Sequence, residues 1–298
     1  MTAAAAIRAG NLVAFPTETV YGLGANALDS RAVEKIFEAK GRPKSSPLIV
    51  HVASIEMARE LSSNWPAAAE ALAQRFWPGP LTLIVPKIPA IPDIVTAGLD
   101  SVGLRIPSHP MALELLRAAG VPIAGPSANR FTELSPTTAE HVRRSFGDQF
   151  EILDGGPCEV GIESTVFHVE SLRILRPGMV TREQIEEVVG PVGIGGESAS
   201  LSPGQHPKHY QPRTRVVMTA EPPANSAYLF WHSRGHAREA ASVRSLRMPA
   251  NAANYAAILY STLHDLDREN FDWIAIEPLP EGPEWDGIRD RLMRATTK

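Results

Sequence analysis

Cysteine is almost absent from this chain, which has one, Cys158, in 298 residues. An internal disulfide is therefore excluded, as are zinc sites built from two or four thiolates. This cysteine usage fits a reducing cytoplasm best. The sequence has neither a basic leader before an apolar core nor an uninterrupted apolar run of membrane-spanning length. We therefore expect neither secretion nor membrane insertion.

An excess of positive charge is also missing. The formal net charge is −4 and the sequence pI is about 6.2, so a polyanion would have to bind through a local cluster of cations. The chain has no Gly-x-x-x-x-Gly-Lys-Ser/Thr phosphate loop, no dinucleotide Gly-x-Gly-x-x-Gly after a strand and no Gly-x-Ser-x-Gly elbow. The histidine pairs at 206/209 and 232/236 lack a third ligand at suitable spacing, so we predict no protein-built metal site.

Apolar residues make up 44% of the chain and follow an alternating pattern of helices and short strands. This pattern predicts an α/β layer domain over 1–189 and a smaller α/β domain over 214–298. Gly, Pro or Ser fills half of 190–213, which is typical of a linker. The predicted helices are 2–9, 30–40, 54–62, 66–76, 109–119, 137–146, 181–189, 251–268 and 284–295. The predicted strands are 12–15, 48–53, 81–86, 102–106, 121–124, 150–153, 164–169, 172–175, 214–218, 227–231 and 272–276.

Two cations stand at the end of the predicted helix 30–40, in Lys40-Gly41-Arg42-Pro43. A helix C-terminus with Lys in its last turn and Gly after it is common, so one interpretation is plain capping. The other is a cleft that binds an anionic substrate through a guanidinium fork and a compact ammonium. We expect both cations to face such a cleft and to be partly exposed.

Other segments raise the same two alternatives. The loop 16–24 offers hydroxyls at Thr17 and Thr19 for a polar substrate, or is a turn closed by side-chain to backbone bonds. Arg105 interrupts an apolar strand, so it pairs with a structural carboxylate or with a ligand's carboxylate. Ser127 and Asn129 follow the strand 121–124 and suit an anion site, or are ordinary capping groups.

Nine ordered motifs together closely resemble the YrdC-domain family of threonylcarbamoyl-AMP synthases, in its longer two-domain form. They are Pro-Thr-Glu-Thr-Val-Tyr-Gly-Leu-Gly at 16–24, Lys-Gly-Arg-Pro at 40–43, Pro-Leu-Ile-Val-His at 47–51, Trp-Pro-Gly-Pro-Leu-Thr at 77–82, Arg-Ile-Pro at 105–107, Pro-Ser-Ala-Asn at 126–129, Ser-Pro-Thr at 135–137, Glu-Ser-Thr at 163–165 and Arg-Pro-Gly at 176–178. Ser46 stands where the family commonly has Asn, and Phe131-Thr132 replaces the usual Ser-Gly. The resemblance implies a twisted open mixed sheet flanked by helices, followed by a small Rossmann-like α/β domain.

The resemblance also implies a reaction. L-Threonine, bicarbonate or CO₂, and ATP would give threonylcarbamoyl-AMP and pyrophosphate, and the product would pass to a tRNA threonylcarbamoyl-transferase complex. Mg²⁺ would accompany ATP. The implied catalytic residues are Lys40 and Arg42. The implied threonine-binding residues are Thr19, His51, Arg105 and Ser164. The implied nucleotide-binding residues are Lys40, Arg42, Ser46, Ser101, Ser127, Asn129, Ser135, Arg176, His209 and Tyr210, with the linker 190–213 as a lid.

Two other functions compete with this one. A double-stranded-RNA-binding module would need the same local cations but no ATP turnover, and the negative net charge argues against it. Carbamoyl transfer in hydrogenase maturation would need an additional acylphosphatase-like or zinc-binding region, which we do not find. For the synthase, we expect Lys40→Ala and Arg42→Ala each to reduce adenylate formation sharply while leaving the fold intact.

Overall fold

The computed structural model describes residues 2–195, 210–232 and 243–296. Within these ranges ten strands form one mixed sheet in the order β10-β9-β8-β4-β5-β3-β6-β2-β1-β7. The sheet contains parallel pairs such as β3 and β5 and antiparallel pairs such as β4 and β5. Its strands are β1 (Val13–Phe15), β2 (Gly22–Asn26), β3 (Ile49–His51), β4 (Leu81–Pro86), β5 (Ser101–Arg105), β6 (Ile123–Ala124), β7 (Glu151–Ile152), β8 (Thr165–His168), β9 (Arg173–Arg176) and β10 (Gly193–Ile194).

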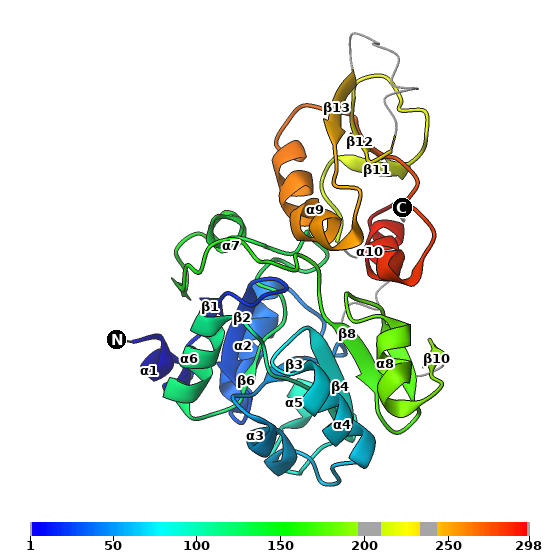
Figure 1. Ribbon diagram of the computed structural model, residues 1–298. Coiled ribbons are helices and arrows are strands. Elements are labelled where there is room, and N and C mark those ends of the chain that lie inside the picture. Colours follow the sequence, from blue (N-terminus) through cyan, green and yellow to red (C-terminus); the bar gives the residue numbers. More distant parts are fainter. Residues whose placement is uncertain (1, 196–209, 233–242, 297–298) are drawn as a thin grey trace.

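Helices flank this sheet (Figure 1). In the described residues of the first domain they are α1 (Ala3–Arg8), α2 (Ser30–Lys40), α3 (Ile55–Glu60), α4 (Ala67–Phe76), α5 (Asp93–Thr96), α6 (Pro110–Ala119), α7 (Ala139–Phe146) and α8 (Arg182–Val189). Helix α2 shows why the sequence forms them: the Asp29 carboxylate caps its first turn by accepting from the amides of Arg31 and Ala32. Gly41 then ends it with a left-handed φ of 63°.

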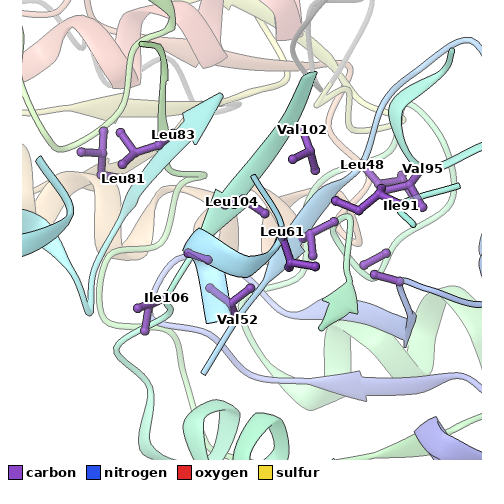
Figure 2. Packing of buried hydrophobic residues seen from close by; sticks show 14 of the residues in the cluster. Leu48, Val52, Leu61, Leu81, Leu83, Ile91, Val95, Val102, Leu104 and Ile106 are labelled. Carbon is purple, nitrogen blue, oxygen red and sulfur yellow. The ribbon is translucent and has the colours of Figure 1, made fainter. Parts of the chain in front are cut away.

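The main hydrophobic core lies between β4, β5 and the helices. Leu83 of β4 stands directly opposite Leu104 of β5 in the antiparallel register, and both side chains are fully buried. Figure 2 shows Leu81 and Leu83 from β4 with Val102 and Leu104 from β5 in this cluster. Consecutive apolar residues along β4 are typical of a strand covered on both faces, which is why the sequence predicted this strand well.

The second domain is a four-stranded, all-parallel sheet in the order β11-β14-β12-β13 within the described residues. It comprises β11 (Arg215–Met218), β12 (Ser226–Phe230), α9 (Ala252–Leu266), β13 (Val243–Arg247), β14 (Trp273–Ile276), a 3₁₀ turn (Pro283–Trp285) and α10 (Asp286–Thr296). This agrees with the expected small Rossmann-like domain. Figure 1 shows α9 and α10 on the side that faces the first domain.

The two domains share a hydrophobic core. Val20, Leu134 and Ile162 of the first domain belong to the same cluster as the apolar side chains of α9 and α10. Gly161 is packed so closely against α9 that a Cβ atom there would lie 2.3 Å from the carbonyl oxygen of Ala256. The second domain is therefore packed directly against the loop that leads into β8.

Four elements were not predicted. Strand β2 contains two glycines and an asparagine, which are typical of a loop. A Cβ on Gly24 would lie 2.9 Å from Phe15 and from Ile123, so packing requires the small residue there. The others are α5, β10, which lies inside the predicted linker, and β13. The predicted helix 284–295 begins instead as the 3₁₀ turn. Most of the predicted linker and lid, 196–209, lies outside the described residues, so its role stays a prediction.

Candidate active site

One cavity gathers loop and strand ends from separate parts of the chain. It is lined by Thr17, Thr19, Val20, Gly22, Arg42, Ile49, His51, Arg105, Gly125, Pro126, Ser127, Glu163, Ser164, Arg176 and Tyr210. These residues come from the β1–β2 connection and the start of β2, the segment after α2, strands β3, β5 and β9, the loop after β6, the segment before β8, and the described end of the predicted linker. All four predicted threonine-binding residues and four of the predicted nucleotide-binding residues meet here: Arg42, Ser127, Arg176 and Tyr210.

The loop after β1 forms the side-chain-closed turn that its sequence allowed, and it also lines the cavity. The Thr17 hydroxyl donates to the carbonyl of Val20 at 2.6 Å and accepts from the amides of Thr19 and Val20, so the turn is closed by its own side chain. The Thr19 hydroxyl lies 2.9 Å from that of Thr17 and lines the cavity. The turn thus fixes the direction of the Thr19 hydroxyl.

Arg105 forms the first of its two alternatives, a structural ion pair, and it also lines the cavity. Its Nη2 lies 2.7 Å from Glu18 Oε1, and both side chains are only 4% exposed. Its Nε donates to the carbonyl of Gly79, while the second oxygen of Glu18 accepts from the amide of Ser108. The structural ion pair therefore exists, and it holds a guanidinium in the cavity wall.

His51 presents an uncharged imidazole to the same cavity. Burial lowers its pKa to about 3, and the neighbouring charge of Arg105 acts in the same direction. The ring is therefore neutral at physiological pH. Its buried Nδ1 has no hydrogen-bond partner within the described residues. A buried polar atom of this kind, facing a cavity, suits a hydrogen bond to a ligand.

Arg42 and Arg176 add two further cations. Burial lowers the pKa of Arg42 to about 10, and Arg176 contributes to the lowering while Tyr210 opposes it. Both guanidinium groups therefore stay protonated at neutral pH. Arg42 donates to the hydroxyl of Ser46 and the carbonyl of Pro47, and its Cζ lies 5.9 Å from the ring centre of Phe131. Arg42, Arg105 and Arg176 together make the cavity a site for an anion.

Lys40 does not line this cavity, contrary to the expectation of a pair facing a cleft. Its Nζ donates to the carbonyl oxygens of Ser127 at 2.6 Å and Asn129 at 2.5 Å. Burial, followed by the charge of Arg42, lowers its pKa well below the ordinary value. Lys40 and Arg42 are 3% and 7% exposed. The expectation that both would be partly exposed, and that removing either would spare the fold for that reason, is therefore wrong.

The remaining predicted nucleotide-binding residues lie around the cavity rather than in its wall. Ser46 supports Arg42, the amide group of Asn129 donates to the carbonyls of Arg130 and Glu133, and Ser135 donates to the carboxylate of Glu163. Ser101 lines a second, smaller cavity, which shares Ile49 with the first. His209 lies outside the described residues.

Sequence reasoning did not assign Glu163 to the site, although it stands in the Glu-Ser-Thr motif. Glu163 lines the cavity, and its carboxylate contacts Arg291, which is 128 positions further along the chain. Because Arg291 lies in an ordinary helical pattern, no local signal identified it.

Among the described residues, no group of three or more His, Cys, Asp or Glu side chains is arranged to hold a metal ion. No helix in the described part of the chain is long and apolar enough to cross a bilayer.

Comparisons with known proteins agree on one family. A family model described as "Telomere recombination" matches residues 5–178, and one described as "Threonylcarbamoyl-AMP synthase, C-terminal domain" matches residues 180–297. The chain is 42% identical to a threonylcarbamoyl-AMP synthase of Bacillus subtilis, over 98% of this chain and 91% of that protein. It is 33% identical to the Schizosaccharomyces pombe protein of that name, over 96% and 85%.

Among solved structures, the crystal structure of P. abyssi Sua5 complexed with L-threonine is similar with a TM-score of 0.90 and 38% identity. The similarity covers 99% of this chain and 93% of that one. Both family models, the full-length relatives and the fold thus lead to one assignment. The chain belongs to the two-domain Sua5/YrdC family of threonylcarbamoyl-AMP synthases.

Proposed function

We propose that this chain is an L-threonylcarbamoyladenylate synthase, a nucleotidyltransferase that condenses L-threonine, bicarbonate or CO₂, and ATP into threonylcarbamoyl-AMP and pyrophosphate. The observation that carries this proposal is the convergence of Arg42, Arg105 and Arg176 on one cavity with the hydroxyls of two loops. The full-length relatives that bear this name, and the similar structure complexed with L-threonine, support it. The product serves the threonylcarbamoyladenosine modification of tRNA.

Threonine occupies the side of the cavity built by Thr19, His51, Arg105 and Ser164. Arg105 binds the amino acid's carboxylate, and Glu18 and Gly79 hold the guanidinium in place. The neutral His51 offers a hydrogen bond without adding charge. Ser164 Oγ lies 2.8 Å from Thr82 Oγ1, so its hydroxyl is held at the wall. These groups leave the threonine amine directed toward the carbon of CO₂ or bicarbonate.

The chemical step joins two anions. A carbamate oxygen of N-carboxythreonine attacks the α-phosphorus of ATP, one O–P bond forms, and the bond to the pyrophosphate oxygen breaks. Because no covalent enzyme intermediate is required, the protein's task is to neutralise and align the reactants. Arg42 and Arg176 supply this charge. Lys40 acts indirectly, since its ammonium holds the carbonyls of the 127–129 loop that forms the nucleotide side.

The nucleotide extends from the main cavity toward the smaller one. Ser101 lines the smaller cavity, and Ile49 is common to both. Ser127 and Tyr210 line the main cavity, while Ser46, Asn129 and Ser135 hold the side chains and loops around them. The predicted role of His209 remains part of this proposal.

Mg²⁺ enters with ATP in this proposal. The nearby carboxylates are already engaged, Glu18 by Arg105 and Glu163 by Arg291. The donor set therefore suits an ion held by phosphate oxygens and water rather than by a protein cage. We also propose that bicarbonate is the carbon source, that a tRNA threonylcarbamoyl-transferase complex receives the product, and that the compartment is the cytoplasm.

Pyrophosphate release from ATP by the purified protein tests this function. The assay offers each of the twenty amino acids in turn, with and without bicarbonate. We expect turnover that requires both L-threonine and bicarbonate. ATP turnover independent of threonine would refute the proposal. Salt-sensitive retention of double-stranded RNA without ATP turnover would favour the RNA-binding alternative instead.

A further inference from the structure

Arg291 of α10 is an arginine of the second domain that is buried against the wall of the active-site cavity. Its side chain is fully buried. Its Nε lies 2.7 Å from Glu163 Oε2, and its Nη2 donates to the backbone carbonyl of Glu163 at 3.1 Å. Its Nη1 donates to the carbonyl of Pro177 at 2.9 Å. One guanidinium thus binds two chain segments, the one that precedes β8 and the one that follows β9.

Those two segments carry residues of the cavity. Glu163 lines it directly, and Ser164 follows immediately. Pro177 follows Arg176, whose guanidinium donates to the carbonyl and the hydroxyl of Ser164. Movement of the Glu163 backbone would therefore displace the Ser164 hydroxyl and the Arg176 guanidinium together.

The carboxylate of Glu163 has further partners on both domains. Ser135 donates to one oxygen, and Tyr260 of α9 donates to the other at 3.2 Å. Arg291 also lies over the ring of Tyr210, 5.5 Å from its centre. Burying the Arg291–Glu163 ion pair costs desolvation free energy that the attraction between the charges can fail to repay. The main contribution of the pair is therefore the geometry that it imposes on its neighbours.

We propose that Arg291 is a positioning residue for the synthase reaction, through which the second domain fixes Glu163, Ser164 and Arg176 in the cavity wall. This inference rests on the proposed function. It gives the second domain a role within the active site, although none of its described residues over 214–296 lines the cavity, and Tyr210, which does, stands in the predicted linker. The close packing of Gly287 in α10 against Gly178, where a Cβ would lie 2.8 Å from the Gly178 Cα, holds the helix at the required depth.

The test compares Arg291→Met with Arg289→Met, a change on the same helix that removes an arginine paired with Asp286 and not among the residues that line the cavity. Thermal unfolding establishes that each variant is folded. For Arg291→Met we expect kcat/KM for pyrophosphate release to fall about 100-fold, because a displacement of about 1 Å at the reacting groups has that effect. We expect Arg289→Met to match the unmodified protein. Equal values for the two variants would overturn the proposal.

The pH profile is the readout that a merely structural role would not change. Burial would raise the pKa of Glu163, but Arg291, Arg176 and Ser135 together lower it to about 2. The other titratable groups around it are Tyr210, Tyr260 and Asp290. In Arg291→Met, fewer partners oppose the effect of burial, so the pKa of Glu163 should rise. The acid limb of the kcat/KM profile should then move to higher pH. An unshifted limb would contradict the proposal.

Arg291→Lys decides the question if Arg291→Met does not fold. Lysine keeps the charge, and with it most of the effect on the pKa of Glu163, but it is a single point charge that cannot grip two segments. We expect reduced kcat/KM with an unshifted acid limb, and unmodified kcat/KM would overturn the proposal. If the unmodified protein released no pyrophosphate, the proposed function would fail on its own. Calorimetric titration of the same variants with L-threonine would then still show whether Arg291 shapes the cavity.

Discussion

Lys40 provides the sharpest test of how this site is built, because it was expected in the cavity and instead lies behind it. The substitution Lys40→Met keeps most of the aliphatic volume and removes the ammonium. The carbonyls of Ser127 and Asn129 then lose a charged donor at 2.6 and 2.5 Å. A hydrogen bond from a charged donor is worth about 1.5–3 kcal/mol, so about 3–6 kcal/mol of interaction is lost.

Part of this loss is offset, because the variant no longer buries a charge. We expect a net decrease of about 3 kcal/mol in the free energy of unfolding, which lowers the thermal midpoint by about 6–12 °C for a chain of this size. The KM for ATP should rise as well, because the 127–129 loop loses its anchor. Differential scanning calorimetry and pyrophosphate-release kinetics measure the two effects.

Lys44→Met is the matched control. Lys44 pairs with Glu34 at the surface, where the two side chains are 59% and 44% exposed. Exposed ion pairs of this kind contribute little, so we expect an unchanged thermal midpoint and an unchanged KM for ATP. If Lys40→Met were as stable and as active as Lys44→Met, our account of the buried ammonium would be refuted.

Three further predictions follow from the site and the domain contact. Arg42→Ala should lower kcat for pyrophosphate release by about 100- to 1,000-fold, the usual effect of losing one preorganised group that stabilises charge, and an unchanged kcat would remove Arg42 from the mechanism. The pKa of His51 is about 3 in the folded protein against an ordinary value of 6.5. The unfolded chain therefore binds more protons between these values, so stability should decline as the pH falls through this window, and less steeply in His51→Gln, as measured by urea unfolding. Gly161→Ala should be about 1–3 kcal/mol more destabilising than Gly156→Ala. Both glycines have a positive φ, but only at position 161 would the added Cβ lie 2.3 Å from a backbone atom, the Ala256 oxygen. Similar thermal midpoints for the two glycine variants would contradict the tight domain contact.

The fold could be predicted where burial is uniform along an element. Strand β4 is covered on both faces, so its residues are consecutively apolar and its bounds, Leu81–Pro86, agree with the sequence pattern. Strand β2 was not predicted, because packing rather than strand propensity determines which residues it contains. Phe15 and Ile123 leave space for glycine alone at position 24, and glycine reads as a loop signal.

The four residues that the family resemblance implied for threonine lie together in one cavity, because strand ends in an α/β sheet converge at one region. The directions in which the side chains point could not be predicted from the sequence. Gly41 takes a left-handed φ of 63° between the two cations of the Lys-Gly-Arg motif. The chain therefore reverses between them, and the side chain of Lys40 stays with α2 while that of Arg42 enters the cavity. A sequence states the spacing of two residues but not the backbone turn that separates their directions.

The same limit applies to charge. Glu18 and Glu163 stand in two motifs as carboxylates with no evident partner, yet each is bound to an arginine, Arg105 at 87 positions' distance in the chain and Arg291 in the other domain. The first pair helps to explain how a cavity lined by three guanidinium groups forms in a protein of net charge −4, because Glu18 is the partner of one of the three, Arg105. Glu18 is not among the residues that line the cavity, whereas Glu163 lines it and is paired with Arg291, which does not. The charge that this cavity presents therefore depends on where the carboxylates and their partners sit, which only the tertiary structure specifies.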